Sequence, residues 1–286
     1  MTTTLTETTS TASPADYLAS DSPASRSASG LIVGTTVDEF SADHLLQLLK
    51  GDVFAVRVAG AATGVALQGL RDRFVGRDDH GPLATDPQFR RIGQAFSEVG
   101  VDGQENYFDE AAHHRGRLRE LAAPYQYPAD TLRILLDEAW PTGATLLTSE
   151  SRKFFAGVVR YQQAGVDLEP HTDNVRRNLP ENDLDIRRQL SVNVYLDVPD
   201  SGGELEIWDV YPTEDEYQEL SGERVWGVNR DAVGDPVLTI RPEVGEAIFI
   251  DPRRVHAVAP SHDRPRVTIG LFIGVRNQDQ ALAVWS

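Results

Sequence analysis

Residues 190–196 and 266–273 alternate strictly between apolar residues and residues that are mostly polar. Since successive side chains of a β-strand point to opposite faces, each segment is predicted to be a strand with one apolar and one polar face. The mostly polar faces of the two strands carry Ser191, Asn193, Tyr195, Arg266, Thr268, Gly270 and Phe272. A half-exposed sheet with its polar side in water would give the same pattern. The alternative is a barrel whose apolar faces meet outer helices and whose polar faces line a cavity.

Three possible metal ligands favour the cavity. On an extended segment, His171 and Asp173 point to the same side. A lone His-x-Asp pair is weak evidence, because a chain with seven histidines gives roughly half a match by chance. The prediction therefore includes a second histidine, His256, later in the chain. Two imidazoles and one carboxylate leave one face of a divalent ion open, as in non-haem Fe(II) oxygenases.

Arg266 and Thr268 follow ten and twelve residues beyond His256. A guanidinium offers a planar fork of donors that matches a carboxylate, and Thr268 shares the strand face of Arg266. Together they could anchor a dicarboxylate whose other end chelates the metal. Arg264 competes for this role, because it falls on the same face if the strand begins early.

With these residues in place, the sequence resembles the Fe(II)- and 2-oxoglutarate-dependent dioxygenases, particularly prolyl hydroxylases and free-standing small-molecule hydroxylases. The similarity spans about residues 150–276. Its blocks are Arg160-Tyr161…Gly165…His171-Thr-Asp173, Gln189-Leu-Ser-Val-Asn-Val-Tyr-Leu196, Gly202-Gly-Glu-Leu-Glu-Ile-Trp208, Gly245…His256 and Arg266-Val-Thr268. The resemblance implies a mainly β protein with flanking helices around a double-stranded β-helix, a jelly-roll, cupin-like core.

The resemblance also implies a site and a reaction. It gives Fe(II) bound by His171, Asp173 and His256. It gives 2-oxoglutarate bound by Arg266, Thr268 and Tyr161, and we expect Asn193 on the polar face to contribute. Oxidative decarboxylation with O2 would then yield succinate and CO2 while an unactivated C–H bond of a small molecule is hydroxylated. An amino acid or an amino-acid-derived natural product of secondary metabolism is the expected substrate.

Other outcomes use the same residues. Desaturation, cyclisation and epoxidation need the same protein groups. Halogenases of this superfamily replace the carboxylate ligand with a small residue, so Asp173 disfavours halogenation. A non-catalytic metal- or ligand-binding β-helix protein would have no use for Arg266 and Tyr161. A zinc hydrolase would need a general base, for which Glu169 is the close candidate.

Residues 174–188 and 209–236 are predicted to form a lid, because long connections in compact domains are usually functional or disordered. The substrate is expected to meet Trp226 and Trp208, the latter presented by a hairpin at Gly202-Gly203. Trp208 is equally compatible with a place in the core. Arg176 and Arg188 could hold a substrate carboxylate, although arginines in such segments are usually solvated.

Length and composition limit the remaining possibilities. The 286 residues suit one domain over 31–286, and residues 1–30 are rich in Thr, Ser and Ala and are predicted to be a disordered tail. A net charge of −17 argues against nucleic acid or an anionic membrane as partner. The absence of cysteine, of a long apolar run and of a signal peptide indicates a cytoplasmic protein. Its oligomeric state is not predicted.

The first half of the chain predicts supporting structure. Apolar spacing indicates helices over residues 43–50, 60–75, 115–122 and 128–140, and a strand over 53–58. Residues 76–110 are predicted to be irregular and near the mouth of the site. His113 and His114 are not expected to share a metal ion, because adjacent side chains point apart.

Overall fold

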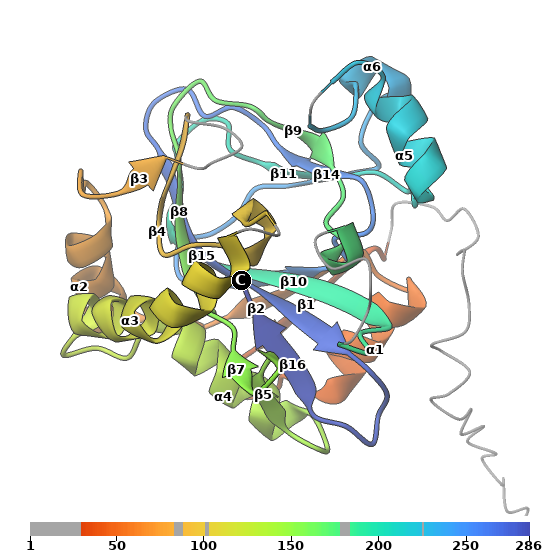
Figure 1. Ribbon diagram of the computed structural model, residues 1–286. Helices are drawn as coiled ribbons and strands as arrows, with labels where there is room; N and C mark the ends of the chain where they lie inside the picture. Colours follow the sequence, from red (N-terminus) through yellow and green to blue (C-terminus); the bar gives the residue numbers. More distant parts are fainter. Residues whose placement is uncertain (1–29, 83–87, 101–102, 178–183, 225) are drawn as a thin grey trace, which may run out of the picture.

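The computed structural model describes residues 30–82, 88–100, 103–177, 184–224 and 226–286 (Figure 1). Almost all of the predicted N-terminal tail lies outside these residues. Two β-sheets and six α-helices make up most of the described chain. No described helix is both long and apolar enough to cross a membrane.

The large sheet has ten strands in the order β1-β2-β13-β10-β15-β8-β4-β3, with β16 pairing with β15 and with β5. Its strands are β1 (Ile32–Thr36), β2 (Ala55–Ala59), β3 (Gly81–Pro82), β4 (Phe89–Ile92), β5 (Ala144–Leu146), β8 (Val158–Gln162), β10 (Arg188–Asp197), β13 (Ala247–Ile250), β15 (Arg266–Val275) and β16 (Leu282–Trp285). The two ten-residue strands, β10 and β15, pair antiparallel at its centre. These strands contain the two alternating segments of the sequence.

The small sheet has the order β12-β11-β14-β9. It comprises β9 (Leu168–His171), β11 (Leu205–Ile207), β12 (Leu238–Ile240) and β14 (His256–Val258). A separate pair is formed by β6 (Thr148–Ser149) and β7 (Arg152–Lys153). No strand pairing joins the large and small sheets among the described residues, so the jelly-roll core is two facing sheets and not a closed barrel.

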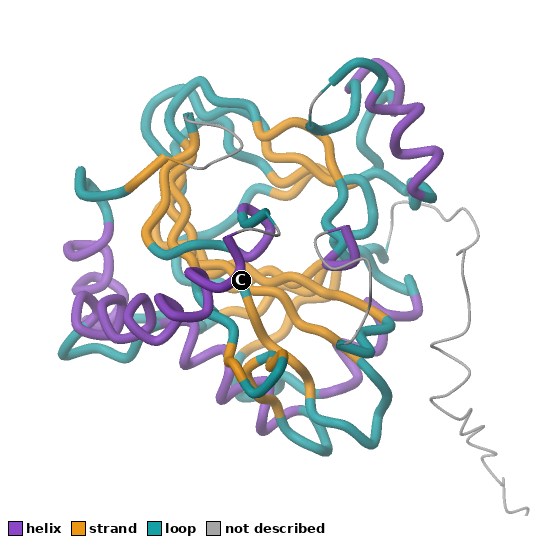
Figure 2. Tube along the Cα trace, in the orientation of Figure 1, coloured by secondary structure: helices purple, strands orange, loops and turns teal. Residues whose placement is uncertain are grey.

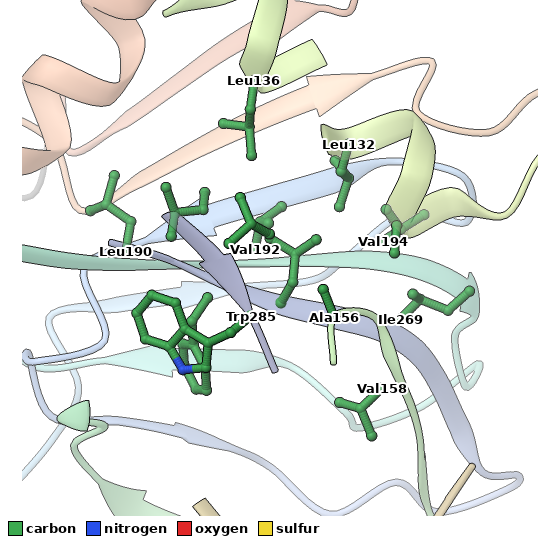
Figure 3. Packing of buried hydrophobic residues seen from close by; sticks show 14 of the residues in the cluster. Leu132, Leu136, Ala156, Val158, Leu190, Val192, Val194, Ile269 and Trp285 are labelled. Carbon is green, nitrogen blue, oxygen red and sulfur yellow. The ribbon is translucent and has the colours of Figure 1, made fainter. Parts of the chain in front are cut away.

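The helices are α1 (Ala42–Lys50), α2 (Gly64–Phe74), α3 (Gln104–Ala122), α4 (Pro128–Ala139), α5 (Glu214–Ser221) and α6 (Arg230–Val233). In Figure 2, α3 and α4 lie below and to the left of the large sheet, on the side away from the small sheet at the top. Figure 3 shows Leu132 and Leu136 of α4 over the face of β10 that carries Leu190, Val192 and Val194. The apolar faces of the central strands therefore meet helices, as predicted.

The Gly202-Gly203 hairpin prediction is wrong. This glycine pair joins β10 of the large sheet to β11 of the small sheet, so it carries the chain between sheets. Both glycines have positive φ, +78° and +77°. A Cβ at Gly202 would stand 2.0 Å from the carbonyl oxygen of Pro260, so this crossing admits only glycine.

The helix predictions are largely confirmed. The predicted helices near 43–50, 60–75 and 128–140 correspond to α1, α2 and α4. The helix predicted from residue 115 begins instead at Gln104, and β4 also lies in the stretch predicted to be irregular. The missed turns of α3 bury Tyr107, Phe108 and Ala111, a short stripe at helical spacing that the surrounding polar residues obscured.

Candidate metal centre and binding cavity

Neighbouring strands of the small sheet bring two histidines together. His171 ends β9, His256 begins β14, and the two are directly paired across these antiparallel strands. Their ring centroids are 4.3 Å apart. Asp173 follows β9, and its backbone N–H donates to the carbonyl of Pro252 at 2.8 Å. The turn after β9 thus returns a carboxylate to the two imidazoles.

The donor atoms of these three residues lie within 4.8 Å of one another. His256 Nε2 is 3.5 Å from Asp173 Oδ2, and His171 Nε2 is 4.0 Å from Asp173 Oδ1. Within the part of the chain that the structure describes, this is the one cluster of His, Asp and Glu that could hold a metal ion. The donor set fits Fe(II), because two imidazoles and a carboxylate leave positions for a cosubstrate and O2.

Backbone carbonyls orient both imidazoles. His171 Nδ1 lies 2.8 Å from the carbonyl oxygen of Glu169, and His256 Nδ1 lies 2.9 Å from that of Arg254. A carbonyl only accepts, so each Nδ1 must carry the proton and donate it. Each Nε2 is then left with a lone pair for the metal.

The surroundings favour the protonation states that a metal needs. Burial, together with the nearby His256, lowers the pKa of His171 to about 4. Burial by itself would raise the pKa of Asp173, but its contact with His256 and the positive charge of Arg160 hold it well below its usual range. The imidazole of His171 is therefore neutral and the carboxylate ionised at neutral pH.

A cavity of about 420 Å³ lies between the two sheets and includes the three candidate ligands. Arg266 of β15 lines it and is only 6% exposed. Its Nη2 donates to the Tyr195 hydroxyl at 3.1 Å and its Nη1 to Gln162 Oε1 at 3.4 Å, while its buried Nε has no partner among the described residues. A guanidinium with spare donors in a closed site could hold a carboxylate.

Several predicted site residues lie in this cavity. Thr268 and Asn193 line it beside Arg266. Trp226 lines it from the small-sheet side, with its ring 4.7 Å from that of His171. Arg264 does not compete with Arg266 for a carboxylate in the cavity, because it does not line the cavity and instead pairs with Asp200 at 2.8 Å.

The structure contradicts the expectation that Tyr161 binds 2-oxoglutarate. Its side chain points to the helix side of β8, where its hydroxyl donates to the carbonyl of Phe74 at 2.8 Å. The neighbours Arg160 and Gln162 line the cavity instead. Tyr161 therefore cannot contact a cosubstrate there.

Three residues predicted to meet the substrate do not line the cavity. Trp208 is buried with Val255 and Ala257, and its Nε1 donates to the carbonyl of Gly234 at 2.8 Å. Arg176 donates to the carbonyl of Ile186 at 3.2 Å. Arg188 is buried and donates to the carbonyl of Leu49 at 2.6 Å. The core alternative for Trp208 is correct.

Part of the predicted lid does cover the cavity. Tyr217 and Ser221 of α5 line it, as does Arg224 just beyond. Arg177 lies 4.1 Å from the centroid of the Tyr217 ring and pairs with Glu214 at 2.8 Å. These contacts join residues 174–177 to α5. Residues 178–183 of the predicted lid lie outside the described residues.

Sequence reasoning assigned no role to three lining residues: Arg160, Gln162 and Tyr195. Tyr195 was on the polar face predicted for β10, so the pattern contained its signal. For β8 the signal was absent, because Val158 and Val159 are both apolar and both buried. Without alternation, the sequence does not reveal which residues of that strand face the cavity.

Residues 35–286 match the family model described as carrier-protein-independent halogenase WelO5. The chain is 27% identical over 263 residues to the L-γ-glutamyl-L-propargylglycine hydroxylase of Streptantibioticus cattleyicolor, covering 86% of this chain and 93% of that protein.

Solved structures share the fold. An N-substituted L-amino acid dioxygenase from Burkholderia ambifaria AMMD, in complex with α-ketoglutarate, superposes with a TM-score of 0.60 at 16% identity, covering 86% of this chain and 91% of that one. HygX from Streptomyces hygroscopicus, with nickel and 2-oxoglutarate bound, gives a TM-score of 0.50 at 14% identity, covering 82% and 87%.

Proposed function

The chain belongs to the family of the carrier-protein-independent halogenase WelO5, and we propose that it is a hydroxylase of a small amino-acid-type substrate and not a halogenase. The protein is a 2-oxoglutarate-dependent non-haem iron dioxygenase, with Fe(II) as its cofactor and 2-oxoglutarate and O2 as cosubstrates.

Asp173 is the observation that carries the choice of outcome. Its carboxylate lies within 4.0 Å of Nε2 of both His171 and His256. A halogenase needs this coordination position for its halide. With a carboxylate there, the metal would have three protein ligands, and its remaining positions would serve the cosubstrate and O2.

The chain's own residues have distinct roles in this proposal. His171, Asp173 and His256 hold Fe(II), which with 2-oxoglutarate and O2 supplies the oxidising power for C–H hydroxylation. Arg266 binds the distal carboxylate of 2-oxoglutarate through donors that the protein leaves free.

The residues around Arg266 complete the cosubstrate pocket. The Tyr195 hydroxyl, which accepts from Arg266, and Thr268 flank the same carboxylate. Asn193 lies further along β10, toward the metal-chelating end. Leu205 and Ile248, which also line this part of the cavity, exclude water from it.

The substrate class is supported by two observations. The relative from Streptantibioticus cattleyicolor, a hydroxylase of a γ-glutamyl amino acid, aligns over 93% of its length. A cavity of about 420 Å³ is in the usual range for small-molecule sites and holds 2-oxoglutarate together with a compact substrate.

The experiment is a succinate-release assay with purified protein, Fe(II) and 2-oxoglutarate. The panel contains free amino acids, N-acetyl amino acids and γ-glutamyl dipeptides, including γ-L-glutamyl-L-propargylglycine. We expect succinate release that depends on an amino-acid-type compound, and a product that has gained one oxygen atom. His256→Ala is the inactive control.

Other results would change the proposal. A product that has lost two hydrogens would indicate desaturation or cyclisation by the same residues. Turnover limited to peptides, nucleic acids or neutral terpenoids would contradict the substrate class. No turnover by an iron-loaded protein with any compound would favour a binding protein.

A further inference from the structure

Arg160 is a charged residue of the cavity to which the proposed reaction gives no role. It lies on β8, directly opposite Thr268 of β15, and its side chain lines the cavity. Burial lowers the pKa of its guanidinium, and the nearby Asp173 opposes that effect. Arg160 in turn influences both His171 and Asp173 electrostatically, so it lies near the metal centre.

No carboxylate among the described residues lies within 4.0 Å of the Arg160 guanidinium, and no described group is hydrogen-bonded to it. The other cavity arginines differ in this respect. Arg177 pairs with Glu214 at 2.8 Å, Arg224 pairs with Glu169 at 2.5 Å, and Arg266 bonds to Tyr195. A half-buried guanidinium without a counterion is costly unless a ligand supplies one.

A count of the charges in the cavity also shows that Arg160 lacks a counterion. Glu98 and Asp173 are the acidic side chains among the described lining residues. Glu98 pairs with Arg91 at 2.5 Å. With cofactor and cosubstrate bound, a divalent iron, dianionic 2-oxoglutarate, Asp173 and Arg266 are together neutral. The positive charge of Arg160 then has no counterpart.

Arg160 and Arg266 serve separate positions. The Nη1 atom of Arg160 comes within 3.4 Å of where a Cβ of Gly270 would stand, so its guanidinium extends over Gly270. Gly270 is four residues from Arg266 along β15, about 13 Å at the usual rise of a strand. A 2-oxoglutarate molecule that spans Arg266 and the metal has no third carboxylate for Arg160.

We propose that Arg160 is the substrate-specificity residue of this enzyme and binds the carboxylate of the substrate. The guanidinium lies over Gly270, and Phe272 and Trp285 line the adjoining part of the cavity with aromatic surface. Arg160 therefore anchors the carboxylate while the aromatic rings contact the rest of the molecule. Ser191 of β10 supplies a hydroxyl to the same region.

This inference rests on the proposed function, and its test separates the two. Binding is measured by calorimetry on the full chain loaded with Ni(II) and 2-oxoglutarate, so that turnover does not interfere. The probes are N-acetyl-L-norvaline and its neutral twin N-acetyl-L-norvalinamide. Both probes are N-acetylated so that they carry no ammonium. A free ammonium would have no acceptor in the cavity, because Glu98 pairs with Arg91 and Asp173 belongs to the candidate metal centre.

Wild-type protein should bind the acid at least ~30-fold more tightly than the amide, the expected effect of one desolvated charge pair. Arg160→Gln should remove that preference by weakening the acid alone. Arg160→Lys should keep part of it, since the charge remains without the fork. Arg176→Gln is the matched control, because Arg176 lies outside the cavity lining. Affinity for 2-oxoglutarate should change less than ~3-fold in all three variants.

Equal binding of acid and amide by the wild type would overturn the inference without any variant. So would a preference that survives in a folded, nickel-binding Arg160→Gln protein. A loss of 2-oxoglutarate affinity equal to that of Arg266→Gln would make Arg160 a cosubstrate ligand instead. If the acid preference depends on Arg160 but no compound releases succinate, the proposed function fails and the carboxylate site stands. Amino-acid turnover with an unchanged substrate KM in Arg160→Gln would refute the carboxylate site and leave the proposed function intact.

Discussion

At the scale of single residues, the backbone decides which nitrogen each histidine offers. The carbonyls of Glu169 and Arg254 accept from the two Nδ1 atoms at 2.8 and 2.9 Å. Both Nε2 atoms are thereby directed at Asp173 before any metal arrives. Such partners hold ligand geometry and tautomer, so the site is organised by strand pairing as much as by its side chains.

His171→Ala and His256→Ala should each abolish stoichiometric binding of Fe(II), because two remaining donors cannot hold the ion as three do. Anaerobic titration with Fe(II), or with Co(II) as a spectroscopic substitute, measures this directly. His113→Ala is the control, since His113 is exposed on α3. Wild-type metal affinity in His256→Ala would remove that residue from the site.

Arg266 and Arg264 provide a matched pair for the cosubstrate. Arg266→Ala removes a buried guanidinium from the cavity and should cost about 2–5 kcal/mol of 2-oxoglutarate binding, a loss of tens- to thousands-fold. Arg264→Ala removes a partly exposed surface pair with Asp200 and should change the affinity less than ~3-fold. Calorimetry with Ni(II) in place of iron gives both values. A larger effect from Arg264 would mean that the cosubstrate lies elsewhere.

At the scale of elements, the strands differ in how much their sequences reveal. In β10 and β15 one face meets helices and the other lines a cavity, so alternation predicted both strands and their polar faces. In β8 all five residues are largely covered, and Tyr161 and Arg160 could not be assigned to faces from the pattern. The strand register decides the assignment: Arg160 lies directly opposite Thr268, so both side chains are on the cavity face and Tyr161 is on the other.

The crossing between the sheets also escaped prediction, because a glycine pair between two strands is also typical of a tight hairpin. What distinguishes the two is a contact distant in sequence, the 2.0 Å approach of Pro260 to the Cβ position of Gly202. Trp208 was affected by the same error. Once β11 lies in the small sheet, this tryptophan packs beneath it and not at the cavity.

Gly202→Ala should therefore destabilise the protein more than Gly76→Ala. Both glycines have a φ of +78°, so a side chain at either position costs about 1–2 kcal/mol in backbone strain. Only at Gly202 does the added methyl meet backbone, whereas nothing lies within 4 Å at Gly76. Urea unfolding followed by circular dichroism compares the two. Equal free energies of unfolding would show that the crossing can relax.

At the scale of the whole molecule, the two sheets contribute different halves of one site. The candidate metal ligands come from the small sheet and the turn after β9, and Arg266 comes from the large sheet. A chelating dicarboxylate would thus link sheets that share no strand pairing in the described chain. The molecule carries a net charge of −17, yet four arginines line this cavity. Local positive charge offsets the overall field for anionic ligands.

Ni(II) and 2-oxoglutarate together should raise the melting temperature more than the sum of their separate effects, because each completes the other's binding site across the sheets. Differential scanning fluorimetry at fixed ligand concentrations measures the three shifts. Arg266→Ala should retain the nickel shift and lose the extra stabilisation. Additive shifts in the wild type would indicate that the two ligands bind independently.

Although this chain belongs to a halogenase family, Asp173 at its metal centre should direct the reaction to oxygen insertion. The most direct measurement is turnover of an amino-acid-type substrate under ¹⁸O2 in a chloride-containing buffer, with succinate and product quantified by mass spectrometry. We expect one ¹⁸O atom in the product for each succinate released, and no chlorinated product. A chlorinated product from the wild-type enzyme would contradict it.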